Sequence, residues 1–268
     1  MKKYWHVINV GIQNTLVYRV NFLFRASFAL IPLIATISLW RAVFASKNSD
    51  PSVVGYSLAG MISYYLLVTI VDAFTAVNED DWQIAADIKD GNINQFLLKP
   101  IDYLWYRLCL FFAGRAIYVI AAAVPVSLFV FLQRQYFVLP ANLPTASLFV
   151  LSMTMTALLQ FFMSYTMAML AFWVLEVSTF IFILFAFEYI AGGHLFPLDI
   201  LPPLVAKLLN FTPFPYQMFF PVSIYLGRVT GAELWQGLII QASWLLIFYG
   251  LARAIWNRGI RRYTAVGG

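Results

Sequence analysis

Long apolar runs dominate the chain and predict membrane-spanning helices. A helix needs about 20 apolar residues to cross a bilayer, because hydrocarbon offers no water to exposed backbone groups. Residues 135–175 contain no charged side chain, a stretch too long for one crossing, and Pro140 and Pro144 predict a turn near its start. We therefore predict an all-α polytopic membrane protein with six transmembrane helices, at about residues 22–44, 53–77, 104–132, 145–172, 174–195 and 234–254.

The first 20 residues follow a different pattern, that of an amphipathic helix. Apolar and polar side chains separate onto opposite faces when they are placed at helical spacing. The apolar face consists of Tyr4, Trp5, Ile8, Ile12 and Leu16, and the polar face of Lys2, His6, Asn9 and Gln13. This pattern is typical of a helix that lies in the membrane interface. The alternative is a plain extension of the first span.

Composition and charge placement support the membrane assignment and orient the chain. Hydrophobic residues make up 62% of the chain and charged residues 11%, whereas a soluble domain carries about 25% charged residues. A soluble enzyme and a nucleic-acid-binding module are therefore excluded. Twelve of the 17 basic residues lie in the N-terminal arm, the connection after the second span with the start of the third, and the C-terminal tail. The positive-inside rule then places both termini in the cytoplasm.

The connection between the second and third spans, residues 78–102, contains half of the 12 acidic residues. A helix over Glu79–Asp90 would have acids near its start and Gly91 at its end, both favourable positions. On such a helix we expect two sides, one with Trp82, Ala85 and Ile88, the other with Asp80, Asp87 and Asp90. Two interpretations stay open: an element that docks into a soluble partner, and a solvated acidic loop.

A motif at the end of this connection resembles a known family. Gly91-Asn92-Ile93, followed by Phe96-Leu97-Leu98-Lys99-Pro100-Ile101, resembles the sequence after the second span in permease subunits of ABC-2-type exporters. The similarity is to a bacterial branch with a glycine, an aliphatic residue and then Leu-Leu-basic-Pro. The layout resembles that family over nearly the whole chain. It implies one transmembrane domain, 1–268, with an interfacial helix at 1–20, a cytoplasmic coupling helix within 78–102 and short external re-entrant helices within 196–230.

The resemblance also implies partners and a location. A permease of this family pairs with a second copy or a homologous permease in the lipids of the bacterial inner membrane, and cytoplasmic ABC ATPase subunits drive the pair. The chain has no G-x-x-x-x-G-K-[ST] loop, so we expect that it is not itself an enzyme, binds no cofactor, and leaves ATP and Mg to the partner. The coupling residues that the resemblance implies are Glu79, Asp80, Asp81, Trp82, Asp87, Gly91, Leu98 and Pro100.

The segment between the fifth and sixth spans is apolar but rich in proline. Residues 191–230 contain six of the chain's 12 prolines. We predict short helices at Leu198–Leu209 and Tyr216–Tyr225, neither of which is long enough to cross the membrane. The resemblance makes them re-entrant helices of an external gate, and the alternative is a seventh span.

Three acids fall within spans or at their edges. Asp72 and Glu176 lie near predicted cytoplasmic ends, where placement in the interface explains them. Glu188 lies deeper in the predicted fifth span. It either forms part of a gate or contacts a cation, or it pairs with a neighbouring helix. Because spans two and five border the route in related permeases, Tyr64, Tyr65, Phe180 and Phe187 are candidate lining residues. We interpret His194 as structural, and no metal site is predicted.

These observations favour a permease subunit of an ATP-driven exporter that carries a lipophilic or amphipathic substrate, such as a drug, a lipid or a glycan-lipid. One alternative is a stand-alone secondary transporter, a class that often has internal repeats; none is evident between the halves of this chain. The other is a membrane-embedded lipid-modifying enzyme, but no set of catalytic groups converges at one membrane depth.

Overall fold

The computed structural model describes residues 2–46, 55–77, 80–174 and 176–263, and these residues form helices without β-strands. In chain order the elements are α1 (Lys2–Leu16), α2 (Arg19–Ala45), α3 (Leu58–Thr75), α4 (Asp80–Lys89), α5 (Asn94–Leu97), α6 (Tyr103–Leu132), α7 (Leu143–Ala168), η1 (Met169–Phe172), α8 (Ser178–Ala191), η2 (Leu198–Ile200), α9 (Pro203–Leu209), η3 (Phe214–Gln217), α10 (Phe219–Tyr225) and α11 (Gly231–Arg262).

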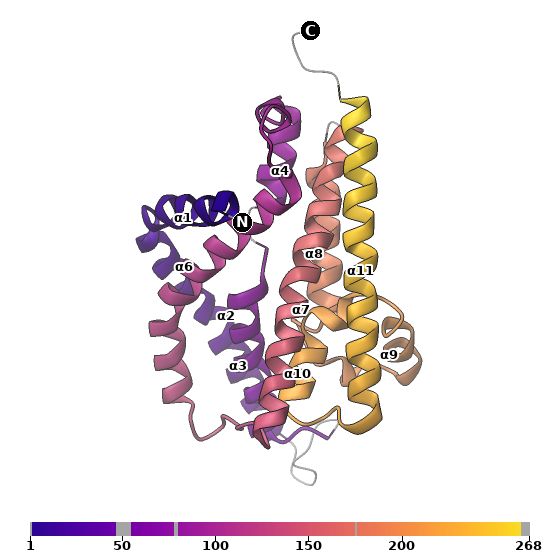
Figure 1. The fold of residues 1–268 in the computed structure, drawn as a ribbon. Coiled ribbons are helices and arrows are strands. Elements are labelled where there is room, and N and C mark those ends of the chain that lie inside the picture. Colours follow the sequence, from indigo (N-terminus) through magenta and orange to yellow (C-terminus); the bar gives the residue numbers. More distant parts are fainter. Residues whose placement is uncertain (1, 47–54, 78–79, 175, 264–268) are drawn as a thin grey trace.

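Five helices within the described ranges are long and apolar enough to cross a membrane: α2, α3, α6, α7 with η1, and α11. They form a bundle, with α1 and the C-terminal end of α11 at the same end (Figure 1). We call this the termini end and the opposite one the far end. The predicted fifth span, 174–195, contains α8, which has 14 residues and is about 21 Å long. A bilayer core is about 30 Å thick, so α8 alone is too short to cross it. The count of six spans therefore stays a prediction.

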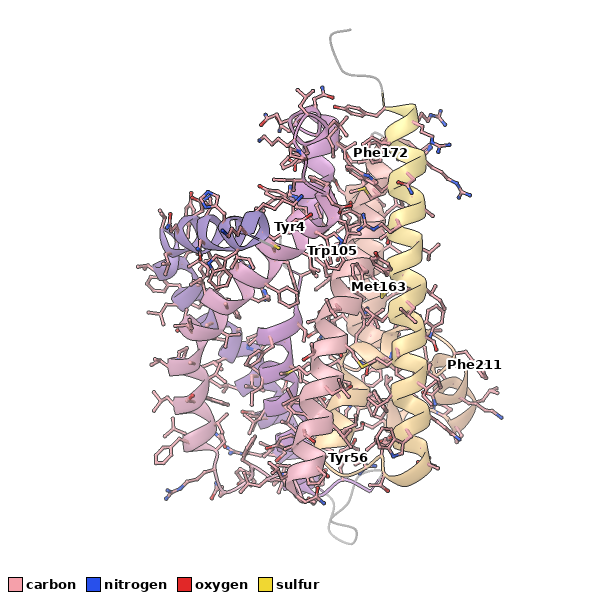
Figure 2. The ribbon with its side chains drawn as sticks, in the orientation of Figure 1. Tyr4, Tyr56, Trp105, Met163, Phe172 and Phe211 are labelled. Atoms are coloured by element: carbon pink, nitrogen blue, oxygen red, sulfur yellow. The ribbon has the colours of Figure 1, made fainter. Side chains whose placement is uncertain are left out.

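The N-terminal helix lies across the bundle instead of extending the first span. A turn at Val17 and Tyr18 separates α1 from α2, and α1 runs at a steep angle to the long helices (Figure 1). Gly11 is buried against α6, where an added Cβ would lie 3.0 Å from Leu110 and 3.1 Å from Ala113. Figure 2 shows Tyr4 of α1 near Trp105 of α6. The amphipathic helix thus forms where the sequence predicts it.

Residues 192–230 form short helices in the far half of the bundle (Figure 1). The prediction of one continuous helix over Leu198–Leu209 is wrong. Leu201 and Pro202 are extended, with ψ of 152° and 141°, because a residue that precedes proline is kept out of the helical region. Tyr216–Tyr225 is likewise divided, at Met218, into η3 and α10. Helix α10 is buried, whereas the apolar side chains of α9 are exposed at the periphery.

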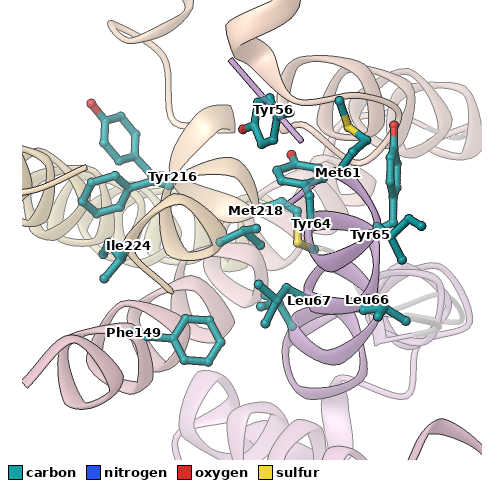
Figure 3. Close-up of a cluster of buried hydrophobic side chains, with 14 of the residues drawn as sticks. Tyr56, Met61, Tyr64, Tyr65, Leu66, Leu67, Phe149, Tyr216, Met218 and Ile224 are labelled. Atoms are coloured by element: carbon teal, nitrogen blue, oxygen red, sulfur yellow. The ribbon is translucent and has the colours of Figure 1, made fainter. Parts of the chain in front are cut away.

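Two clusters of buried side chains make up the core. The far-end cluster lies between α3, α7, η3, α10 and α11, and Figure 3 shows Tyr64, Leu67 and Met218 at its centre. The cluster at the termini end joins α4 to α6, α7 and α11 through Ile84, Tyr103 and other buried residues. Because lipid is as apolar as these side chains, close packing holds such helices together more than the hydrophobic effect does.

A buried glutamine adds polar contacts between spans. Gln241 of α11 is fully buried. Its Nε2 donates to the backbone oxygens of Tyr216, at 2.9 Å, and Ser152, at 3.1 Å, and to Oγ1 of Thr156, at 3.1 Å. The hydroxyl of Ser152 donates back to Oε1 of Gln241 at 2.9 Å. The network fastens η3 to α7 and α11 and so fixes one side of the region after α8.

Candidate coupling surface and membrane cavity

Helix α4 has a buried side that attaches it to the membrane bundle. Ile84, Ala85 and Ile88 are 1%, 6% and 3% exposed. They lie in the buried cluster at the termini end, where α4 packs against α7 and η1. The expected apolar side is partly wrong, because Trp82 is 45% exposed. The buried stripe runs instead through Asp81, Ile84, Ala85 and Ile88, the i, i+3, i+4, i+7 spacing that keeps side chains on one face of a helix.

The second attachment of α4 is an ionic one. Arg107, near the start of α6, is 4% exposed, and its Nη2 donates to Oδ2 of Asp87 at 2.5 Å. Tyr103 also donates to this carboxylate, at 2.7 Å, and accepts from Nε of Arg107 at 2.9 Å. Nη1 of Arg107 donates to Gln83 at 3.2 Å. Asp87 therefore points into the chain, and its expected place on an exposed acidic face is wrong.

The other acids of the predicted acidic face are distributed unevenly. Asp81 is 8% exposed, and its carboxylate accepts the backbone N–H of Trp82 at 2.8 Å. Asp90 is exposed. Glu79 and the side chain of Asp80 lie outside the described residues. Because Asp81 is buried and Asp87 is paired with Arg107, the exposed side of α4 is less acidic than the sequence indicates.

Large apolar side chains of this region are exposed, along with polar ones such as Gln83, Lys89 and Gln95. Leu98 is 89% exposed, Leu97 49% and Trp82 45%. Together with the exposed Pro100, these three side chains form what we call the coupling surface. Gly91, with φ of 78°, makes the left-handed turn that leads from α4 toward α5, a conformation that costs glycine little. The carbonyl of Pro100 accepts from Nζ of Lys3 at 2.6 Å, which links the coupling surface to α1.

Further contacts connect this region to α11. Asp102 caps α6 by accepting the N–H of Trp105 at 3.1 Å, and it also accepts from Nη1 of Arg253 at 2.5 Å. The ring of Tyr103 stacks on Trp256 of α11 with centroids 5.1 Å apart. A displacement of α4 and α5 would therefore act on α6, α7 and α11 together.

A cavity of about 370 Å³ lies between α2, α3, α7 and α8. Of the predicted route residues, Tyr65 and Glu188 line it. Tyr64 lies beside it, fully buried. Phe180 and Phe187 are 43% and 57% exposed on the outer surface of α8, and neither is among the cavity's lining residues.

The two tyrosines hold the turn that follows α8. The hydroxyl of Tyr64 donates to the carbonyl of Gly193 at 2.6 Å, and that of Tyr65 donates to the carbonyl of Leu195 at 2.9 Å. Tyr65 also accepts from Nε1 of Trp40 at 3.0 Å. Both side chains thus fasten the turn to α3, and Tyr65 at the same time forms part of the cavity wall.

Two residues that the sequence did not assign to the route complete the polar wall. Asp72 of α3 and His194 line the cavity, with Nε2 of His194 3.7 Å from Oδ1 of Asp72. Nδ1 of His194 lies 3.3 Å from the backbone oxygen of Glu188, whose carboxylate accepts from Nε2 of Gln217 at 3.1 Å. No local signal joins Asp72 to His194, because only the tertiary fold brings the end of α3 to the turn after α8.

Glu176 is placed differently from the other two acids. It is fully exposed before α8, and its carboxylate accepts the N–H of Ser178 at 3.0 Å. The hydrogen bonds from Ser178 lower the pKa of Glu176 below its ordinary value. Its expected placement in the membrane interface stays a prediction. Across the described ranges, no three His, Cys, Asp or Glu residues gather as a set of metal ligands.

Comparison with known families decides the identity of this helical bundle. A model of the ABC-2 family transporter proteins matches residues 30–267, nearly the whole chain. The chain belongs to the ABC-2 transporter family. Membership indicates a multi-pass membrane permease and implies ABC ATPase partners in general. No curated protein matches this permease significantly. The bacterial branch with the Leu-Leu-basic-Pro motif stays a prediction.

Proposed function

We propose that this chain is the permease subunit of an ATP-driven exporter, and that the coupling surface docks into a separate cytoplasmic ABC ATPase. The coupling surface carries the proposal. Trp82, Leu97 and Leu98 are apolar yet exposed, at a position where α4 is attached through buried contacts to α6 and α7. An exposed apolar patch of this kind is typical of a protein interface.

The mechanism follows from the attachment. ATP and Mg bind the partner ATPase, whose closure pushes on the coupling surface. Because Asp87 is tied to Arg107 and Asp102 to Arg253, the push reaches α6 and α11. Because α4 also packs on α7, which lines the cavity, the push changes access to the cavity. Coupling of this kind is reciprocal, so cargo that binds the permease also alters ATP turnover by the partner.

The proposal includes an assembly and an orientation. Two permeases, identical or homologous, form the membrane part, and the termini end faces the cytoplasm of a bacterial cell. The cargo is lipophilic or amphipathic, because the cavity combines polar groups with apolar walls such as Leu33, Val68 and Phe185.

Substitution of Leu98 tests the docking step. L98D places a charge at the most exposed side chain of the coupling surface, and we expect ATPase binding to weaken by at least about tenfold, as at interface hot spots. The measurement is co-purification with the ATPase, followed by ATP turnover of the reconstituted complex. L143D is the matched control, since Leu143 is 82% exposed at the far end.

Two outcomes contradict the proposal. Unchanged ATPase binding and turnover in L98D would show that the coupling surface is not the docking site. Cargo transport by the purified permease alone, driven by an ion gradient without an ATPase, would instead establish a secondary transporter.

A further inference from the structure

The cavity contains polar side chains that the protein itself does not satisfy. Gln160 and Ser164, one turn apart on α7, line the cavity and are each 7% exposed. Neither side chain forms a hydrogen bond to another described residue. Their polar atoms reach the open cavity, where a bound molecule can form hydrogen bonds with them. The two side chains therefore indicate a polar group of a ligand in the cavity.

The charge of the cavity wall determines whether a cationic or an anionic ligand is favoured. Asp72 and Glu188 contribute two acidic groups. His194 lies near the carboxylate of Asp72 and the backbone oxygen of Glu188, and it adds at most one positive charge when its ring is protonated. The lining residues include no lysine or arginine. The wall is thus acidic, which disfavours anions and favours a cation.

The remaining wall selects the kind of cation. Leu33, Val68, Phe185 and Tyr189 provide apolar and aromatic surface, and aromatic faces attract organic cations. A volume of about 370 Å³ is within the range of small-molecule sites and far exceeds one metal ion. An ammonium group can donate several hydrogen bonds at once, which matches the acceptors on Gln160, Ser164 and the two acidic groups.

From this arrangement we infer that the cavity binds an amphipathic organic amine. The protonated amine lies between Asp72 and Glu188 and donates to Gln160 and Ser164, and the apolar body of the ligand packs on Val68 and Phe185. As a cargo assignment, the inference rests on the proposed export function. As a binding site, it belongs to this chain alone and is testable without the ATPase.

Binding of dansylcadaverine, a fluorescent apolar compound with a primary amine, tests the site. The probe is titrated against the full-length chain in phosphatidylcholine nanodiscs. We expect saturable binding that D72N and E188Q each weaken by at least about tenfold, since each removes a charge-assisted contact. E176Q, which removes an exposed acid outside the cavity, should bind as the wild type does. N-acetylated dansylcadaverine, which lacks the charge, should bind at least about tenfold more weakly than the amine.

A second variant separates the site from folding. Q160L keeps the charge of the cavity and removes one hydrogen-bonding group, so we expect weaker binding at an unchanged melting temperature. Equal binding of the amine and its acetylated form, or equal binding by wild type, D72N, E188Q and Q160L, would overturn the inference. Amine binding that depends on Asp72 and Glu188, without ATP-driven export by the assembled complex, would support the site and contradict the proposed function. Export of another cargo without amine binding would support the proposed function and contradict the amine site.

Discussion

A single buried arginine attaches the coupling helix to the third predicted span. Arg107 is 4% exposed and contacts Asp87, Tyr103 and Gln83. Removal of one partner from such a pair leaves the other charge buried without compensation. The contact therefore matters for the position of α4 as well as for overall stability.

We expect R107A to lower the free energy of unfolding by about 3 kcal/mol and to loosen α4 specifically. D87N should cost less, because its amide oxygen still accepts from the guanidinium. Hydrogen exchange of the backbone amides in α4 measures the local effect. R258A, which changes an exposed arginine of the same end, is the control. Unchanged exchange in α4 would contradict the attachment.

At the scale of elements, the turn after α8 joins α3 to the short helices of the far half. Gly193 has φ of 96°, and an added Cβ would lie 2.7 Å from the hydroxyl of Tyr64 and 2.9 Å from Cβ of Phe219. The carbonyl of Gly192 accepts from the N–H of Phe219 at 2.9 Å. The turn thus fixes α10 against α3 as well as forming part of the cavity wall.

G193A is expected to lower the melting temperature more than G227A does. Both substitutions force an alanine into the left-handed region, at a cost of about 1–2 kcal/mol each. Gly227, with φ of 68°, has no heavy atom within 4 Å of an added Cβ. G227A therefore measures the conformational cost without a steric clash. Equal shifts in the two variants, measured in detergent, would show that the close approach of Tyr64 and Phe219 is unimportant.

At the scale of the whole molecule, basic residues separate between the two ends of the bundle. The termini end has Lys2, Lys3, Arg258, Arg261 and Arg262 on α1 and α11. Arg41 and Arg134 lie toward the far end, where Arg41 donates to Gln133 at 2.8 Å. By the positive-inside rule, we expect the more basic end to face the cytoplasm.

We therefore expect a green fluorescent protein fused after Gly268 to fluoresce in a bacterial host, since this reporter folds in the cytoplasm. Alkaline phosphatase inserted in the 133–142 loop should be active, since it needs the oxidising periplasm. The reverse pattern, a dark fusion with inactive phosphatase, would invert the proposed orientation and with it the assignment of the coupling surface.

Helices whose signal is local could be predicted from the sequence. The apolar runs predicted α2, α3, α6, α7 and α11, because backbone satisfaction in hydrocarbon depends on nearby residues alone. The amphipathic pattern predicted α1, and acids followed by Gly91 predicted α4 within one or two residues. Prolines indicated short helices after α8, but the break at Pro202 was placed inside a continuous helix.

The sequence by itself determined the membrane class, most of the helices and the region proposed to meet an ATPase. Only the tertiary structure decided which side chains face which neighbours. It turned Asp87 inward to Arg107, left Trp82 and Leu98 exposed, and brought Asp72, Gln160, Glu188 and His194 into one cavity. Helical spacing states which residues share a face, but the packing of distant helices decides what that face meets.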